Sequence, residues 1–87
     1  MERYWLFAFD SPHAAIAAQK LLAGCGAVVM PTLRSITASC GISLRLSDGE
    51  IERAKGILRA SYIDSARYRL YRVEREGNEA RCAPVEF

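Results

Sequence analysis

Long apolar runs, a strong excess of charge and metal-binding side chains are all scarce in this sequence. Its apolar runs fall far short of the roughly 20 residues that cross a bilayer, and no cleavage site follows the first segment, so we expect neither a membrane span nor a signal peptide. Twelve Lys and Arg against ten Asp and Glu leave a net charge of +2, too small to indicate bulk binding to nucleic acid or membranes. The odd number of cysteines, three, excludes complete disulfide pairing within one chain. We therefore expect reduced thiols and a cytoplasmic location.

What is present fits one small domain. The chain has 87 residues, of which 51% are hydrophobic and 25% charged. This length is too short for two ordinary domains, and such a chain buries only roughly 60% of its unfolded surface. The core is therefore small. Either the helices and the sheet pack tightly against each other, or a partner covers part of the apolar surface.

The first third of the chain predicts a strand, a helix and a second strand. Residues 4–9 are aromatic and apolar, as in a central strand. Ser11 suits the N-cap and Pro12 the first position of a helix over residues 12–23, which Gly24-Cys25-Gly26 ends. Residues 27–30 form a short second strand, which Pro31 breaks.

The rest of the chain predicts a loop, a strand, a helix and a last strand. A loop over residues 31–40 leads into a strand over residues 41–46, whose apolar and polar residues alternate. Ser47 and Glu50 have the spacing of a capping box, which opens a helix that extends to about residue 60. Residues 68–73 form the fourth strand. The helices are expected to bury these residues: Ala14, Ile16, Ala17, Leu21, Leu22, Ile51, Ala54, Ile57 and Leu58.

This βαββαβ order is typical of an α+β, ferredoxin-like fold, with a four-stranded antiparallel sheet and two helices on one face. We expect a single domain over residues 1–75 and a polar, flexible tail over residues 76–87. In this topology residues 10–13, 31–41 and 60–66 gather at one end of the domain.

A candidate site follows from that placement. Cys40 would lie near the N-terminus of the first helix, where free backbone N–H groups favour an anion. Arg34 of the same loop and His13 of the first helical turn would each favour a thiolate, and Gly41 would leave room to approach the sulfur. Serine hydroxyls, including that of Ser39, would add donors. The alternative is that Cys40 is a small core residue. In a regular strand, Cys40 would point to the same face as Ile42 and Leu44.

The other two cysteines predict no chemistry. Cys25, between two glycines at a helix end, is interpreted as a packing residue, and nothing around Cys82 would activate it. Neither the cysteine spacings nor the single histidine suits a zinc site, so no metal and no cofactor are expected.

The loop residues carry a resemblance. Pro31-Thr32-Leu33-Arg34 and Ser39-Cys40-Gly41-Ile42-Ser43-Leu44-Arg45 resemble the "putative selenium/sulfur carrier protein-like" family, a bacterial domain of unknown function, over residues 4–73. The helix start at Ser11 is also similar, whereas Leu33 stands where the family commonly has a second proline. The resemblance implies that Cys40 is a carrier thiol, that Arg34 and Gly41 belong to its site, and that partner proteins donate and accept sulfur or selenium. It implies an accessory carrier and not a stand-alone enzyme.

A binding module without chemistry is the competing hypothesis. The sheet face away from the helices could gather aromatic rings and arginines, as in RNA-binding domains, but the strand over residues 41–46 has no aromatic residue. We therefore expect no nucleic-acid partner and favour a homo-oligomer contact through that open face.

Overall fold

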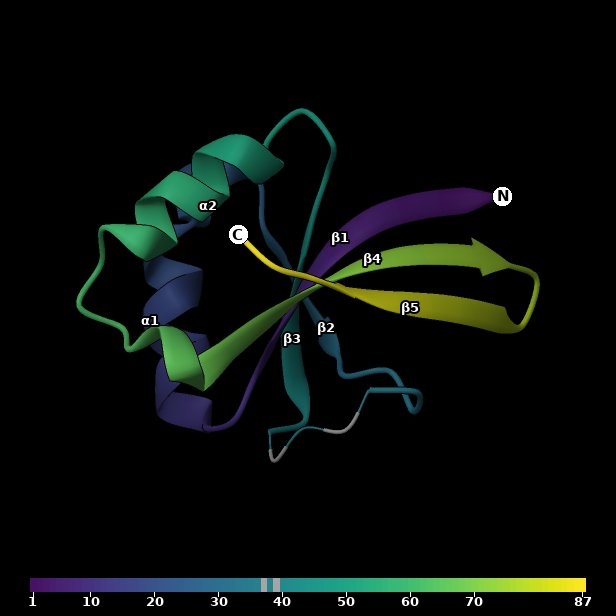
Figure 1. Ribbon diagram of the computed structural model, residues 1–87, viewed down its shortest axis with the longest axis horizontal. Helices are drawn as coiled ribbons and strands as arrows, with labels where there is room; N and C mark the ends of the chain where they lie inside the picture. The colour runs from purple at the N-terminus through teal and green to yellow at the C-terminus, as the bar shows by residue number, and fades with distance from the viewer. Residues whose placement is uncertain (37, 39) are drawn as a thin grey trace.

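Five antiparallel strands form one sheet in the order β2-β3-β1-β4-β5 (Figure 1). The computed structural model describes residues 1–36, 38 and 40–87. The strands are β1 (Glu2–Phe9), β2 (Val28–Pro31), β3 (Ile42–Leu46), β4 (Tyr68–Glu76) and β5 (Glu79–Val85). The helices are α1 (Pro12–Leu21) and α2 (Ile51–Arg59), with short 3-10 turns η1 (Ala23–Cys25) and η2 (Ser65–Arg67). Both α-helices lie on the same side of the sheet (Figure 1).

The fifth strand corrects the predicted four-stranded sheet. Residues 79–85, expected to lie in a polar tail, pair with β4 from Glu76↔Glu79 to Leu70↔Val85. Gly77, with φ of 60°, turns the chain between the two strands in a backbone conformation that side chains disfavour. The strand was missed because a charged stretch from Glu74 to Arg81 leads into it and Pro84 interrupts its apolar end. It lies at the sheet edge, where Glu79, Arg81 and Ala83 are exposed.

The main core lies between the helices and the sheet. Phe7 and Phe9 of β1 and Leu44 and Leu46 of β3 point into it, as the alternation predicted for β3. The helices contribute mainly small residues and leucines, namely Ala14, Ala15, Ala18, Leu22, Ile51, Ala54 and Leu58. The predicted burial of Ile16 is wrong, since 46% of it is exposed. Alanines on α1 allow the helix to approach the sheet closely.

The two helix starts differ from each other. Ser11 caps α1 as predicted: its Oγ accepts a hydrogen bond from the Ala14 N–H at 3.2 Å. The predicted capping box at α2 is wrong, because Glu50 occupies the N-cap and makes no side-chain cap bond. The Ile51 N–H instead donates to the Ser47 backbone carbonyl at 3.1 Å, so a backbone turn starts the helix.

A second buried cluster covers the other face of the sheet. Tyr4, Leu6 and Ala8 of β1 and Val73 of β4 point away from the helices and pack with Ile36 of the loop that joins β2 to β3. This loop lies on the side of the sheet opposite the helices (Figure 1). The expectation of an open face is therefore wrong where Ile36 covers it.

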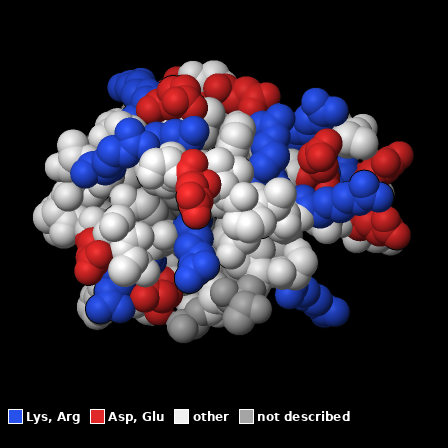
Figure 2. Space-filling model, in the orientation of Figure 1, with Lys and Arg blue, Asp and Glu red and all other residues white. Residues whose placement is uncertain are grey.

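The surface carries charges of both signs, and the helices are short. Acidic and basic side chains are interspersed over the face drawn in Figure 2. Among the described residues, each helix is too short or too polar to cross a membrane.

Candidate functional site

Cys40 lies at the end of the β2–β3 loop, two residues before β3. Only 4% of it is exposed, and it packs into the main core with Ala14 of α1 and Leu44 of β3. Its Sγ accepts a hydrogen bond from the Ile42 N–H at 3.4 Å. A backbone N–H that points at a sulfur can stabilise negative charge there. Gly41, the next residue, is exposed, so the chain reaches the surface immediately beside the buried thiol.

Thr32 closes the loop that carries Cys40. Its backbone N–H donates to the Gly41 carbonyl at 3.0 Å, and its hydroxyl donates to the Cys40 carbonyl at 3.1 Å. The same hydroxyl lies 2.7 Å from that of Ser43, which is fully buried on β3. Three contacts from one residue thus hold the start of the loop against its end. The backbone around Cys40 is fixed by them.

The other predicted site residues lie apart from the thiol. Arg34 is exposed and lines a shallow hollow with Arg75 and Asn78 of the β4–β5 hairpin. His13 is exposed on the first turn of α1, and the Ser11 hydroxyl is used to cap that helix. Ser39 lies outside the described residues. Within the described chain, no hydrogen bond or ion pair joins Arg34 or His13 to Cys40.

The predicted gathering of segments at one end of the domain is confirmed. The end of β1, the β2–β3 loop and the η2 turn together line a hollow of about 530 Å³. Asp10 follows β1 there, and its Oδ2 accepts from the Arg67 guanidinium at 3.0 Å. The Asp10 N–H also donates to the Arg67 carbonyl at 3.1 Å, which continues the β1–β4 pairing by one step.

The remaining cysteines occupy different environments. Cys25 is 2% exposed and belongs to the main core. Cys82 on β5 is half-buried beneath the loop, and its Sγ lies 3.2 Å from the Ser35 hydroxyl. The part of the chain that the structure describes holds no group of three His, Cys, Asp or Glu side chains placed to bind a metal ion.

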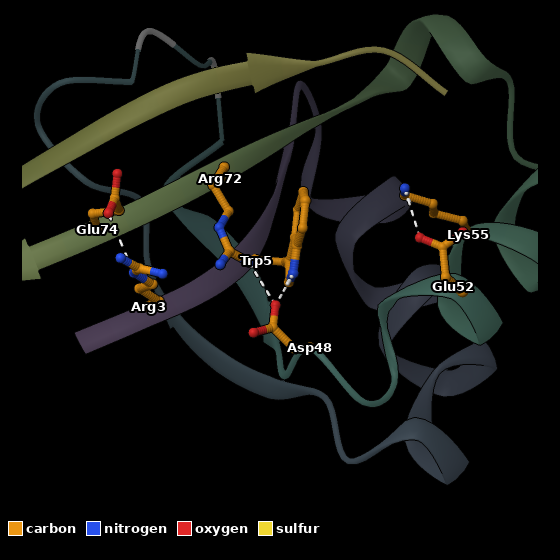
Figure 3. A network of polar contacts seen from close by, with 7 residues as sticks. All are labelled: Arg3, Trp5, Asp48, Glu52, Lys55, Arg72 and Glu74. Atoms are coloured by element: carbon orange, nitrogen blue, oxygen red, sulfur yellow. Dashed lines mark hydrogen bonds and ion pairs between the residues drawn. The ribbon is translucent and has the colours of Figure 1, made fainter. Parts of the chain in front are cut away.

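A polar network surrounds the single tryptophan (Figure 3). Asp48 accepts hydrogen bonds from the Trp5 indole at 2.6 Å and from the Arg72 guanidinium at 2.5 Å. Arg72 also lies over the Trp5 ring, 4.6 Å from its centre, and Lys55 approaches the ring at 5.4 Å. The hydrogen bond from Arg72, helped by that from Trp5, lowers the pKa of Asp48. This network joins β1, β4 and the turn before α2, and its Asp48 follows β3 at the end opposite to the Cys40 loop.

Sequence reasoning missed Thr32, Ser43 and the polar hollow. The alternation of β3 does place Ser43 on the face away from the helices, but only the folded loop shows that this face is covered. The apolar residues Leu33, Ile36 and Ala38 in this loop were the available signal. Ile36 anchors the loop on the sheet, and with it the residues that line the hollow.

These features define a small α+β domain in which a loop, closed by Thr32, places one thiol at the end of the sheet. A comparison with protein families matches residues 4–68 to the family described as "Putative Se/S carrier protein-like". The match covers most of the chain, and the chain belongs to this family. The match ends before β5. The comparisons with curated proteins and with solved structures gave no match.

Proposed function

We propose that the protein carries sulfur or selenium on Cys40, as a persulfide or selenopersulfide, between a donor and an acceptor protein. One observation carries the proposal: Cys40 lies in the part of the chain matched to the carrier family, at the end of a closed loop, with the Ile42 N–H directed at its sulfur. The carrier would act in the bacterial cytoplasm. Its fold would be a ferredoxin-like arrangement to which β5 has been added.

The transfer requires no external oxidant or reductant. The Cys40 thiolate attacks the outer sulfur of a donor persulfide, a new S–S bond forms, the old one breaks and the donor leaves as a thiolate. An acceptor thiolate then attacks the outer sulfur on Cys40, and Cys40 leaves as a thiolate. With selenium the outer atom is Se and the electron count is the same. The Ile42 N–H would stabilise the negative sulfur in both steps.

Loop opening is part of this proposal, because a donor protein cannot reach a thiol that is 4% exposed. Gly41 and the loop would move away from the core, and the three contacts of Thr32 would have to open. A buried resting thiol also protects a bound persulfide from solvent. Arg34 and His13, both exposed, would contact the partner and not the sulfur.

The test is to incubate the protein with a donor protein that carries a persulfide or a selenopersulfide and to measure the mass of the acceptor chain. We expect one added sulfur or selenium atom on the wild type and on Cys82→Ser, and none on Cys40→Ser. An equal adduct on Cys40→Ser, or no adduct on the wild type, would sink the proposal. Cys25→Ser is the matched control for a buried thiol.

A second candidate is a ligand- or protein-binding regulatory module without chemistry. The burial of Cys40 favours it, because a packing cysteine in a core cluster needs no further role. On this hypothesis Cys40 is alkylated only as fast as the domain unfolds. A homo-oligomer would have to use surfaces other than the part of the sheet beneath Ile36.

A further inference from the structure

The hollow at the end of β1 is lined by charges of both signs. Its charged lining residues are Asp10, Arg67 and, on β4, Arg69. Ala8 is paired with Arg69 in the sheet and points to the loop side, so the Arg69 side chain projects to that side as well. Asp10 continues β1 opposite Arg67. Asp10 and Arg69 are therefore diagonal neighbours, with backbones about 7–8 Å apart.

Asp10 and Arg69 of this hollow can each form further hydrogen bonds. Asp10 gives one oxygen to Arg67, while its Oδ1 is buried and has no partner among the described residues. A buried carboxylate oxygen without a donor is unfavourable, and a donor from a ligand would relieve this after a small side-chain rotation. Arg69 makes no ion pair within the described chain. The hollow thus offers an acceptor and a fork of donors side by side.

The rest of the lining is small and apolar or aromatic. Ala8 forms part of the floor, Ala38 of the loop and Ala66 of η2 form walls, and the half-buried Tyr71 lies on β4. The volume, about 530 Å³, lies in the range of small-molecule sites. The hydroxyl of Ser35 is also at this surface.

We propose that the hollow binds a free α-amino acid with an uncharged side chain. The α-carboxylate would pair with Arg69 and the α-ammonium with Asp10, while the side chain would lie against Ala38, Ala66 and Tyr71. The three charges of the hollow sum to +1, so a cation alone is disfavoured there. A carboxylate would pair with Arg69, and an ammonium on the same ligand would add a contact with Asp10, whose Oδ1 has no partner among the described residues. This site does not involve Cys40, and it gives the domain a ligand whether or not it carries sulfur.

The test is calorimetric titration with L-methionine, whose thioether cannot exchange with the cysteines. We expect saturable binding to the wild type. N-acetyl-L-methionine, which lacks the ammonium, and L-methioninamide, which lacks the carboxylate, should each bind at least tenfold more weakly. Equal binding of either derivative, or no saturable binding of L-methionine, overturns the proposal.

Variants locate the site. Arg69→Gln and Asp10→Asn should each weaken L-methionine binding at least tenfold. Arg75→Gln should leave it unchanged, because Arg75 lies on the same strand and face but six residues away, about 20 Å along β4. Binding that Arg69→Gln does not alter contradicts the proposal, and thermal unfolding confirms that each variant is folded. Cys40→Ser should bind L-methionine as the wild type does. Failure of persulfide transfer and failure of L-methionine binding are therefore independent results.

Discussion

The hydroxyl of Thr32 lies 2.7 Å from the hydroxyl of Ser43, and together they tie the β2–β3 loop to the sheet. A hydroxyl has one proton, and that of Thr32 donates to the Cys40 carbonyl, so Ser43 donates to Thr32. Ser43 is fully buried, and a buried hydroxyl needs such a partner. The pair therefore couples the interior of the sheet to the backbone position of the candidate thiol.

The substitution Thr32→Val should both destabilise the domain and expose Cys40. It removes the acceptor for the Ser43 hydroxyl and the donor for the Cys40 carbonyl at nearly constant volume. We expect the free energy of unfolding to fall by about 1–3 kcal/mol. Alkylation of Cys40 under native conditions should become faster, because the loop opens more often. Urea unfolding and mass mapping of the alkylated peptides measure the two effects.

Thr32→Ser is the matched control, since it keeps the hydroxyl and loses only a methyl group. It should retain the slow alkylation of Cys40. If Thr32→Val and Thr32→Ser alkylate Cys40 at equal rates, the hydroxyl contacts do not hold the loop closed.

The three cysteines should separate into one fast and two slow thiols. Cys82 is half-buried at the sheet edge, whereas Cys25 and Cys40 are 2% and 4% exposed. Iodoacetamide should therefore modify Cys82 first in the native protein. A fast phase that persists in Cys82→Ser and maps to the Cys40 peptide would show that Cys40 is open at rest, contrary to the closed loop.

The sequence predicted most of the fold because its local signals agree with its packing. Ser11, Pro12 and Gly26 mark the limits of α1 and its following turn, and Gly26 has the left-handed φ of 68° that a helix end favours. The sequence did not predict β5, because edge strands carry charged residues on their exposed side and so resemble polar tails. Only the pairing of β4 with β5 distinguishes the two.

The site was predicted less completely, for a physical reason. The topology places the loop, the end of β1 and the η2 turn together, and the structure confirms this. Whether Cys40 points into the core or outward, and whether Arg34 accompanies it, depends on how the loop folds over the sheet. That path is set by the packing of Ile36 with residues of β1 and β4 and by the hydrogen bonds of Thr32 to Cys40 and Ser43, which a single sequence does not reveal.

Removal of the serine side chain before α1 should destabilise the domain more than the same change before α2. Ser11→Ala removes the acceptor for the Ala14 N–H and should lower the free energy of unfolding by about 1 kcal/mol. Ser47→Ala is the matched control: only the backbone carbonyl of Ser47 is used at α2, so its substitution should change stability by less than about 0.5 kcal/mol. Thermal or urea unfolding measures both. A larger loss for Ser47→Ala would restore the capping box that the sequence predicted.

Protonation of Asp48 should break its network, at a pH below the ordinary range for carboxyl groups. The Arg72 hydrogen bond holds the pKa of Asp48 below its ordinary value of 3.8 in the folded state. The network therefore stabilises the fold above about pH 3.8, and this contribution is lost as the pH falls through the lower folded-state pKa. Because Trp5 is the only tryptophan and donates to Asp48, its fluorescence should report the change with a midpoint below pH 3.8.

Asp48→Asn provides the comparison, since the amide keeps an acceptor oxygen but does not titrate. This variant should lack the acid step in Trp5 fluorescence and should show a weaker dependence of stability on salt, because the ion pair with Arg72 is gone. If the wild type and Asp48→Asn show a fluorescence step with the same midpoint, another carboxylate causes the step. Asp10→Asn serves as a second control, as Asp10 pairs with Arg67 at the other end of β1, away from the tryptophan.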